Sequence, residues 1–147
     1  MRAALIGVPF ALAVVGSALA QVPASGSSIL QGVGLDGRWA VDCNKPVSEG
    51  NAFLTYVTPD NGVPTEHYRV DPLDEHVTEL LDVQKLKNGD LQWVIAEGEV
   101  MITIVTQVRD NRLRTWSSST SEGHEYITKG KLGDGKPAPW FNKCETN

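Results

Sequence analysis

Hydrophobic and polar side chains alternate along most of the chain between Asp36 and Gly130. Leu91, Trp93 and Ile95 occupy every second position of one stretch, and β-branched residues recur in the same way over 100–108. A period of two is typical of a β-strand with one buried face. The pattern therefore predicts about eight strands, at 37–43, 50–58, 63–70, 76–86, 91–97, 100–109, 112–119 and 124–130.

Short turn signals separate these strands. Asn, Asp and Gly tolerate positive φ angles and favour tight hairpins. They gather at the strand junctions as Asp60-Asn61-Gly62, Asn88-Gly89-Asp90, Glu97-Gly98-Glu99, Asp110-Asn111 and Glu122-Gly123. Connections this short place each strand beside the next, which predicts an antiparallel up-and-down order.

One segment allows two interpretations. Over 74–87 the apolar positions also fit the spacing of a helix, with Asp74 as its N-cap. The pair Asn88-Gly89 joins this segment directly to the strand at 91–97, as a hairpin turn does. A strand is therefore favoured over a helix.

An open sheet of this size would expose two long edges, and closure into a barrel removes them. The sequence thus predicts an all-β domain, an eight-stranded antiparallel up-and-down barrel, with a β-sandwich as the alternative. The interior of an eight-stranded barrel is either filled by side chains or holds one small ligand. Both possibilities stay open at this stage.

The first 20 residues have the layout of a secretory signal peptide. A basic start at Met1-Arg2 precedes an apolar run over 3–15 and small residues that end at Ala20. The alternative is a membrane anchor, but the run is shorter than the roughly 20 residues that a span requires, and it contains Pro9. Export predicts a periplasmic or secreted protein with no membrane span after cleavage.

Residues 21–35 carry no charge and are rich in Gly and Ser, which is typical of a flexible leader. A single domain is then expected at 36–147. Its two cysteines, Cys43 and Cys144, bracket nearly all of it. In an oxidising compartment such a pair forms a disulfide, and closing a loop of about 100 residues stabilises a fold by roughly 4.7 kcal/mol. A free catalytic thiol is the alternative, disfavoured by the Pro-rich tail before Cys144.

The net charge of −5 argues against a general nucleic-acid binder, which needs surplus Lys and Arg. The charge is unevenly distributed, however, because Arg109, Arg112 and Arg114 lie close together in the sequence. They form either a basic patch for an acidic partner or a solvated strand face with cross-strand pairs.

Two short motifs resemble a known fold family. Gly37-Arg38-Trp39 opens the first predicted strand, and Arg114-Thr115-Trp116 lies near the last ones. A G-x-W start with a late Arg resembles the calycin barrels, of the lipocalin and avidin type. The resemblance implies that Arg114, or Arg112, packs across Trp39, a cation–π contact worth about 0.5–2 kcal/mol.

A second likeness spans nearly all of 36–144. Three segments resemble a group of small exported bacterial proteins of unassigned function: GRWAVDC at 37–43, RLRTWSS at 112–118 and PWFNKC at 139–144. This resemblance implies a shared disulfide-closed domain and no particular activity.

The search for catalytic or metal-binding motifs favours a protein that is not an enzyme. His67, His76 and His124 lack the spacing of a metal site, and the acidic stretch at 71–76 is better explained as a solvated turn. Residues 130–136 match the start of a P-loop but continue into Pro137. The serines at 117–121 lack a G-x-S-x-G motif. No metal or cofactor is therefore expected.

The sequence as a whole predicts a monomeric binding protein with a small apolar or amphipathic ligand in the mouth of a barrel. The candidate lining residues are Trp93, Ile102, Ile104 and Tyr126, which would otherwise fill the core. The alternative is an exported inhibitor or protein-interaction module that acts through its surface. Calycin-type barrels include bacterial protease inhibitors, and the leader at 21–35 is long enough to reach into a cleft.

Overall fold

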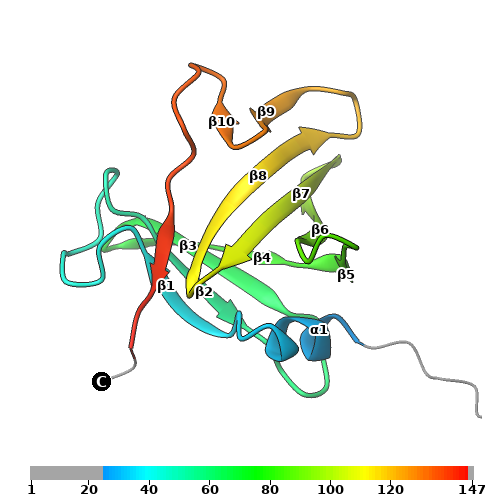
Figure 1. Ribbon diagram of the computed structural model, residues 1–147, viewed down its shortest axis with the longest axis horizontal. Coiled ribbons are helices and arrows are strands. Elements are labelled where there is room, and N and C mark those ends of the chain that lie inside the picture. Colours follow the sequence, from blue (N-terminus) through cyan, green and yellow to red (C-terminus); the bar gives the residue numbers. More distant parts are fainter. Residues whose placement is uncertain (1–24, 146–147) are drawn as a thin grey trace, which may run out of the picture.

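The computed structural model describes residues 25–145. In this part of the chain, one helix and eleven strands form a nearly closed antiparallel barrel (Figure 1). The elements are α1 (Gly26–Gly32), β1 (Gly37–Ala40), β2 (Phe53–Val57), β3 (Thr65–Asp71), β4 (Asp74–Glu79), β5 (Leu81–Lys85), β6 (Leu91–Glu97), β7 (Val100–Arg109), β8 (Arg112–Thr120), β9 (Glu125–Thr128), β10 (Lys131–Leu132) and β11 (Phe141–Lys143).

The strands follow the order β4-β3-β2-β1-β11-β8-β7-β6-β5 around the barrel. The two outer members, β4 and β5, are joined by the single residue Leu80, whose amide donates to the Pro64 carbonyl at 2.8 Å. This hydrogen bond extends the β3–β4 ladder to the point where the barrel closes. The predicted antiparallel barrel is confirmed.

Strand β11 departs from the simple up-and-down order. It inserts between β1 and β8, where Lys143 pairs with Trp39 and Phe141 pairs with Leu113 (Figure 1). The predicted last strand, β9, pairs with the other end of β8 and with β10. The path around the barrel therefore has nine strands rather than eight.

The ambiguous segment at 74–87 consists of two strands and no helix, as favoured by the sequence. Leu80 is 2% exposed and marks the break between them. Asp82 has a φ of 46°, and the pairing of β5 with β6 shifts register between Leu81 and Gln84. A bulge of this kind bends a strand sharply, which lets the chain pass from β4, at one edge of the sheet, to β5, at the other edge.

The predicted turns form where Asn, Asp and Gly gather. Asp110 and Asn111 have φ angles of 50° and 57° and connect β7 to β8 directly. Two consecutive residues with positive φ are the mark of a type I′ turn, whose twist matches that of the flanking strands. The hairpin between β5 and β6 also turns through a residue of positive φ, Gly89, at 86°.

The inward faces of the strands form one hydrophobic core. Its largest fully buried side chains are Trp39, Trp93 and Tyr56, each 2% exposed or less. Around them pack aliphatic residues from both halves of the barrel, which are Leu30, Leu35, Leu54, Leu80, Leu91 and Leu113.

Helix α1 corrects the expected flexible leader over residues 25–35. Ser25 caps the helix, since its hydroxyl accepts from the Ser28 amide. Leu30 and Leu35 are fully buried in the core. The segment is ordered because these two side chains bury apolar surface, which its Gly- and Ser-rich composition masks in the sequence. Among residues 25–145, no helix is long and apolar enough to span a membrane.

The expected signal peptide at 1–20, and residues 21–24 of the expected leader, lie outside the described residues.

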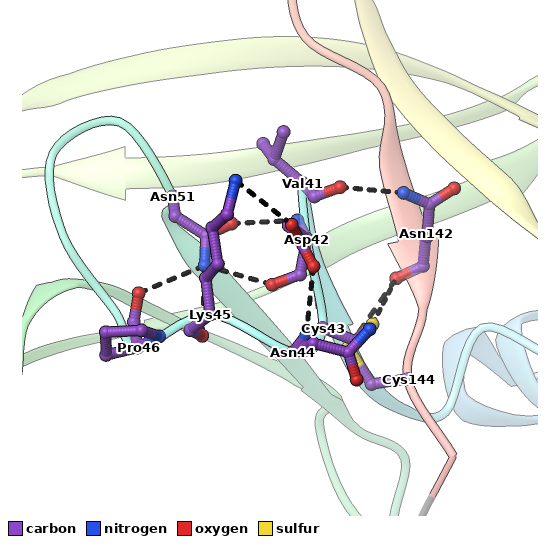
Figure 2. Close-up of a disulfide and its surroundings, with 9 residues drawn as sticks. All are labelled: Val41, Asp42, Cys43, Asn44, Lys45, Pro46, Asn51, Asn142 and Cys144. Atoms are coloured by element: carbon purple, nitrogen blue, oxygen red, sulfur yellow. Dashed lines mark hydrogen bonds and ion pairs between the residues drawn. A yellow bond between two sulfur atoms is a disulfide. The ribbon is translucent and has the colours of Figure 1, made fainter.

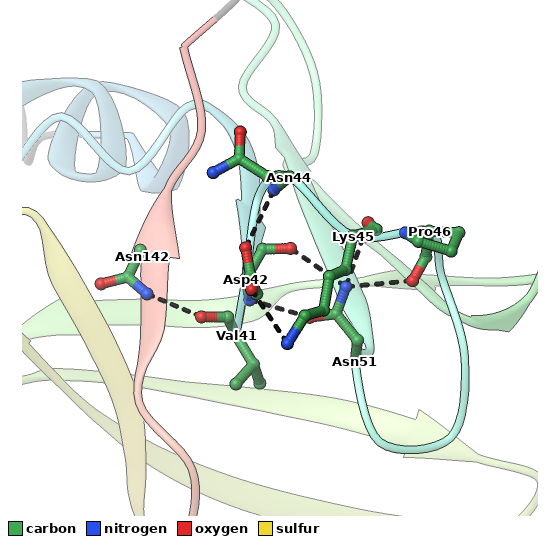
Figure 3. A network of polar contacts seen from close by, with 7 residues as sticks. All are labelled: Val41, Asp42, Asn44, Lys45, Pro46, Asn51 and Asn142. Carbon is green, nitrogen blue, oxygen red and sulfur yellow. Dashed lines mark hydrogen bonds and ion pairs between the residues drawn. The ribbon is translucent and has the colours of Figure 1, made fainter.

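The predicted disulfide between Cys43 and Cys144 is confirmed, and it joins residues 101 positions apart (Figure 2). Beside it, the loop that connects β1 to β2 folds around Asn51, which is 5% exposed. The Asn51 side chain accepts from the Asp42 amide and donates to the carbonyls of Asp42, Lys45 and Pro46 (Figure 3). These contacts give hydrogen-bond partners to backbone groups of the loop, and they fix the loop where Cys43 meets the C-terminal strand.

Candidate functional site

A cavity of about 210 Å³ lies inside the barrel. Its walls come from both halves of the chain, because β2 and β3 face β6, β7 and β8 across the interior. Apolar and aromatic side chains predominate and polar groups are few, as in most small-molecule sites. The lining residues are Leu54, Tyr56, Glu66, Tyr68, Trp93, Ile104, Thr115, Ile127, Ala138, Pro139 and Phe141.

The structure brings together two of the four residues expected to contact a ligand. Trp93 and Ile104 pair in register on β6 and β7 and line the cavity. Ile102 is 4% exposed and belongs to the buried core, outside the cavity lining. Tyr126 is 47% exposed and packs edge-on against His124, away from the cavity.

Strands β2 and β3 supply the residues that the sequence analysis missed. Tyr56 pairs with Glu66, and Leu54 pairs with Tyr68, so all four side chains point to the same face of the sheet. The sequence of β3 gives little indication of this, because polar residues occupy both of its faces: Glu66 and Tyr68 alternate with His67 and other polar side chains.

Four of the residues that line the cavity are aromatic. The ring centroids of Tyr56 and Trp93 lie 5.9 Å apart, and the ring planes are inclined at 67°. This edge-to-face contact is a favoured aromatic geometry and sets the two rings at an angle to each other. Tyr68, which is 39% exposed, and the buried Phe141 complete the aromatic part of the lining.

The indole N–H of Trp93 is buried and has no hydrogen-bond partner among residues 25–145. Trp39, the other fully buried tryptophan, donates its Nε1–H to the Leu35 carbonyl at 2.8 Å. A buried donor without an acceptor costs about 1–3 kcal/mol.

Glu66 brings a carboxyl group into the same cavity. Burial raises the pKa of Glu66, while a hydrogen bond from the Tyr56 hydroxyl and the charge of His76 act in the opposite direction. Burial and the nearby Glu66 charge also raise the pKa of Tyr56 and of Tyr68. Both tyrosines therefore stay protonated near neutral pH and are able to donate hydrogen bonds.

Arg114 does not pack on Trp39 as the calycin resemblance implies. Lys143 takes that place, with its Nζ 5.4 Å from the centroid of the Trp39 ring. Leu113 and Thr115 face the interior of the barrel, so Arg112, Arg114 and Trp116 project from its outer side.

On that outer side, four side chains form an Arg–Trp ladder, consisting of Arg112, Trp140, Arg114 and Trp116. The Arg114 guanidinium lies 4.5 Å from the Trp140 ring centroid and 5.1 Å from that of Trp116. The Arg112 guanidinium lies 5.3 Å from the Trp140 centroid. The ladder attaches the segment before β11 to the outer face of β8.

The third arginine of the expected basic patch is occupied differently. Arg109 forms an ion pair with Asp90, a carboxylate that is 1% exposed. Asn88 also donates to Asp90 at 2.8 Å. Arg109 therefore serves to neutralise a buried charge at the β5–β6 hairpin and does not add to a patch with Arg112 and Arg114.

The acidic stretch at 71–76 forms the β3–β4 hairpin, where Leu73 is 97% exposed. On it, Glu75 lies 3.3 Å from His67 Nδ1. Across residues 25–145, no group of three or more His, Cys, Asp or Glu side chains is arranged to hold a metal ion.

Comparisons with protein-family models, curated proteins and solved structures found no match to this chain. The geometry alone thus defines the class: a small, disulfide-closed antiparallel β-barrel with a partly aromatic interior cavity.

Proposed function

We propose that this domain is an exported, non-enzymatic binding protein that holds a small amphipathic molecule in its barrel cavity. The observation that carries the proposal is a cavity of about 210 Å³ whose lining is mostly apolar and includes the acidic side chain of Glu66. Small-molecule sites have this composition, with a few polar groups among apolar and aromatic side chains. Burial raises the pKa of Glu66, and its carboxyl group gains from a polar partner.

The size of the cavity limits the ligand to a small molecule. An apolar cavity of about 150 Å³ is enough to bind benzene in an engineered protein. The cavity here is somewhat larger, and Glu66 and Thr115 are polar residues in its lining. It therefore suits a molecule with a compact apolar body and one or two polar atoms.

The disulfide supports the proposed exported location. Structural disulfides persist in oxidising compartments and are rare in the reducing cytosol. Cys43 and Cys144 are bonded to each other, which fits function in the periplasm or outside the cell.

Native mass spectrometry of protein purified from its own host tests the proposal. We expect a bound small molecule that is lost from an Ala138→Leu variant, because Ala138 is 3% exposed and lines the cavity. The matched control is Ala96→Leu, at an exposed position that does not line this cavity. Protein that is consistently empty and also fails to take up small apolar or amphipathic probes would disprove the proposal.

A second candidate function uses the outer surface. The guanidinium groups of Arg112 and Arg114 stack on Trp140 and form no ion pair within the described residues. Their N–H edges are suited to carboxylates of an acidic protein segment. Residues 25–35 take no part in this alternative, because they are packed into the domain. Binding of a poly-glutamate peptide that is lost in Arg112→Gln but kept in the control Lys131→Gln, at an exposed position, would support it, and equal binding by both variants would exclude it.

A further inference from the structure

The barrel has a seam where β4 and β6 lie near each other without pairing. The chain bends at Leu80, so that β4 pairs with β3 and β5 pairs with β6. The β5–β6 ladder extends only to Val94, and the end of β6 beyond it has no strand partner on that side within residues 25–145. A groove of about 200 Å³, here called the seam groove, lies between the two edges. Its lining residues are His76, Val77, Thr78, Glu79, Leu81 and Ala96.

The free edge of β4 presents backbone groups to this groove. The Leu80 amide donates to the carbonyl of Pro64, the residue opposite it, so hydrogen-bonded and non-hydrogen-bonded pairs alternate from there along the β3–β4 ladder. Thr78 therefore bonds to β3, whereas the N–H and C=O groups of Val77 and Glu79 point away from β3. An extended chain is able to add to a sheet edge through groups of this kind.

The side chains along this edge carry negative charge. His76 and Thr78 pair with the cavity-lining residues of β3, so the alternate residues Glu75, Val77 and Glu79 face outward. Val77 is 52% exposed, and Glu79 has no ion-pair partner within the described residues. Strands β4 and β6 contain acidic residues but no Lys or Arg. The outer face of the edge is thus an apolar side chain between two carboxylates.

This charge pattern selects the kind of chain that fits. A second copy of β4, paired antiparallel about Val77, would place Glu75 opposite Glu79, and like charges opposite each other destabilise a sheet. Lys or Arg at the same positions would place opposite charges across the pair, which is favourable. The complementary strand is therefore basic and belongs to another protein.

We propose that the free edge of β4 binds an extended segment of another protein, in which an apolar residue has a Lys or Arg two positions before it and two positions after it. The segment adds to β4 as a strand, with its apolar residue beside Val77 and its basic residues beside Glu75 and Glu79. Backbone hydrogen bonds hold the segment, and the charges distinguish it from other extended chains. This surface is separate from the barrel cavity and does not depend on the proposed function.

Two peptides of opposite charge test the proposal: acetyl-TKTVTKT-amide and acetyl-TETVTET-amide. Titrations of the full domain are followed by two-dimensional NMR of the backbone amides. We expect the lysine peptide to bind about tenfold or more tightly than the glutamate peptide. At saturation with the lysine peptide, hydrogen exchange should slow at the amides of Val77 and Glu79. The Thr78 amide, which already faces β3, is the internal control and should change little.

A charge-reversal variant tests the role of Glu79. Glu79→Lys should weaken binding of the lysine peptide and strengthen binding of the glutamate peptide. The matched control is Glu145→Lys, which makes the same change in net charge at an exposed position after β11. Because β11 is midway between β4 and β5 in the strand order, it lies across the barrel from the seam groove. Glu145→Lys should leave both affinities unchanged.

Val77→Pro tests the backbone contact. Proline lacks an N–H and is tolerated at an edge strand where that N–H faces outward, so the β3–β4 ladder should remain intact while the lysine peptide no longer binds. If this variant does not fold, hydrogen exchange in the unmodified protein still decides. Equal affinities for the two peptides, absence of binding, or unchanged exchange at Val77 and Glu79 on saturation would each overturn the proposal. None of these results would affect the ligand cavity.

Discussion

Lys143 lies with its ammonium group over the ring of Trp39, 5.4 Å from the centroid, and the two residues pair directly across β1 and β11. The same ammonium group donates to the Gly34 carbonyl. The contact therefore ties three parts of the chain together: the turn after α1, the first strand and the last strand. In this barrel a lysine from the C-terminal strand occupies the place that the calycin resemblance assigns to an arginine.

Replacing Lys143 by Met tests this contact. The variant keeps a flexible apolar side chain over Trp39 but removes the charge and the hydrogen bond to Gly34. We expect the free energy of unfolding to fall by about 0.5–2 kcal/mol, measured by urea denaturation. Lys131→Met is the control, at an exposed position on β10, and should change stability by less than about 0.5 kcal/mol. Equal effects of the two substitutions would show that the contact with Trp39 contributes nothing.

Gly130 has a φ of 71° and lies against the outer face of β8. A Cβ atom added there would be 3.1 Å from Trp116 Cε3 and 3.3 Å from Arg114 Cζ. Gly130→Ala therefore combines an unfavourable backbone conformation with crowding of the Arg–Trp ladder. We expect a loss of about 1–3 kcal/mol in the free energy of unfolding.

Gly123→Ala separates these two causes. Gly123 has a similar φ of 88°, but nothing lies within 4 Å of its added Cβ. We expect Gly123→Ala to lower the free energy of unfolding only by the cost of the unfavourable backbone conformation. The near-ultraviolet circular dichroism of Trp116 and Trp140 should change only in Gly130→Ala. Equal losses of stability and identical spectra would contradict the crowding.

The period-two pattern identified most of the barrel because inward-facing positions in its central strands are strongly apolar. Leu91 and Trp93 in β6, and Leu113 in β8, are each 1% exposed or less. Turn chemistry then set the strand order, since pairs such as Asp110-Asn111 leave room only for a tight hairpin. Strand β11 was missed because it has only three residues, which is too short to show an alternating pattern, and because it follows Pro137 and Pro139.

The residues that line the cavity were predictable only in part, because the sequence of one strand does not show which other strand it pairs with. Trp93 and Ile104 stand out as large apolar residues in strands whose sequences alternate between apolar and polar positions. Glu66 does not, because an acidic residue in a strand is normally solvated, and only the pairing of β3 with β2 places it opposite Tyr56. Pairing between separate strands fixes which residues share the interior, and the sequence of a strand with polar residues on both faces does not reveal it.

Helix α1 is expected to be part of the folded domain rather than a dispensable leader. Leu30 is fully buried in the core, so Leu30→Ala should lower the free energy of unfolding by about 2–5 kcal/mol. Leu73→Ala, at a position that is 97% exposed, is the matched control and should have little effect. Thermal or urea denaturation provides the measurement. Unchanged stability in Leu30→Ala would mean that the segment detaches from the barrel in solution.

Glu66 is expected to make the stability of the unliganded protein depend on pH. Burial raises the pKa of Glu66 in the folded state above its ordinary value of 4.5, so the folded protein favours the protonated carboxyl. A raised pKa contributes stability that is fully present below 4.5 and is lost as the pH rises through the folded-state value. Because Glu66→Gln mimics the protonated side chain at every pH, this variant should become progressively more stable than the unmodified protein towards neutral pH.

Urea denaturation of both proteins between about pH 4 and pH 8 measures this difference. The charge of His76 lowers the pKa of Glu66, so the comparison is repeated in a His76→Gln background, where the folded-state pKa of Glu66 is higher and we expect a larger difference towards neutral pH. Glu79→Gln is the control, an exposed carboxylate on β4 that does not line the cavity. A stability difference between Glu66→Gln and the unmodified protein that stays constant with pH would show that the Glu66 carboxyl is solvated.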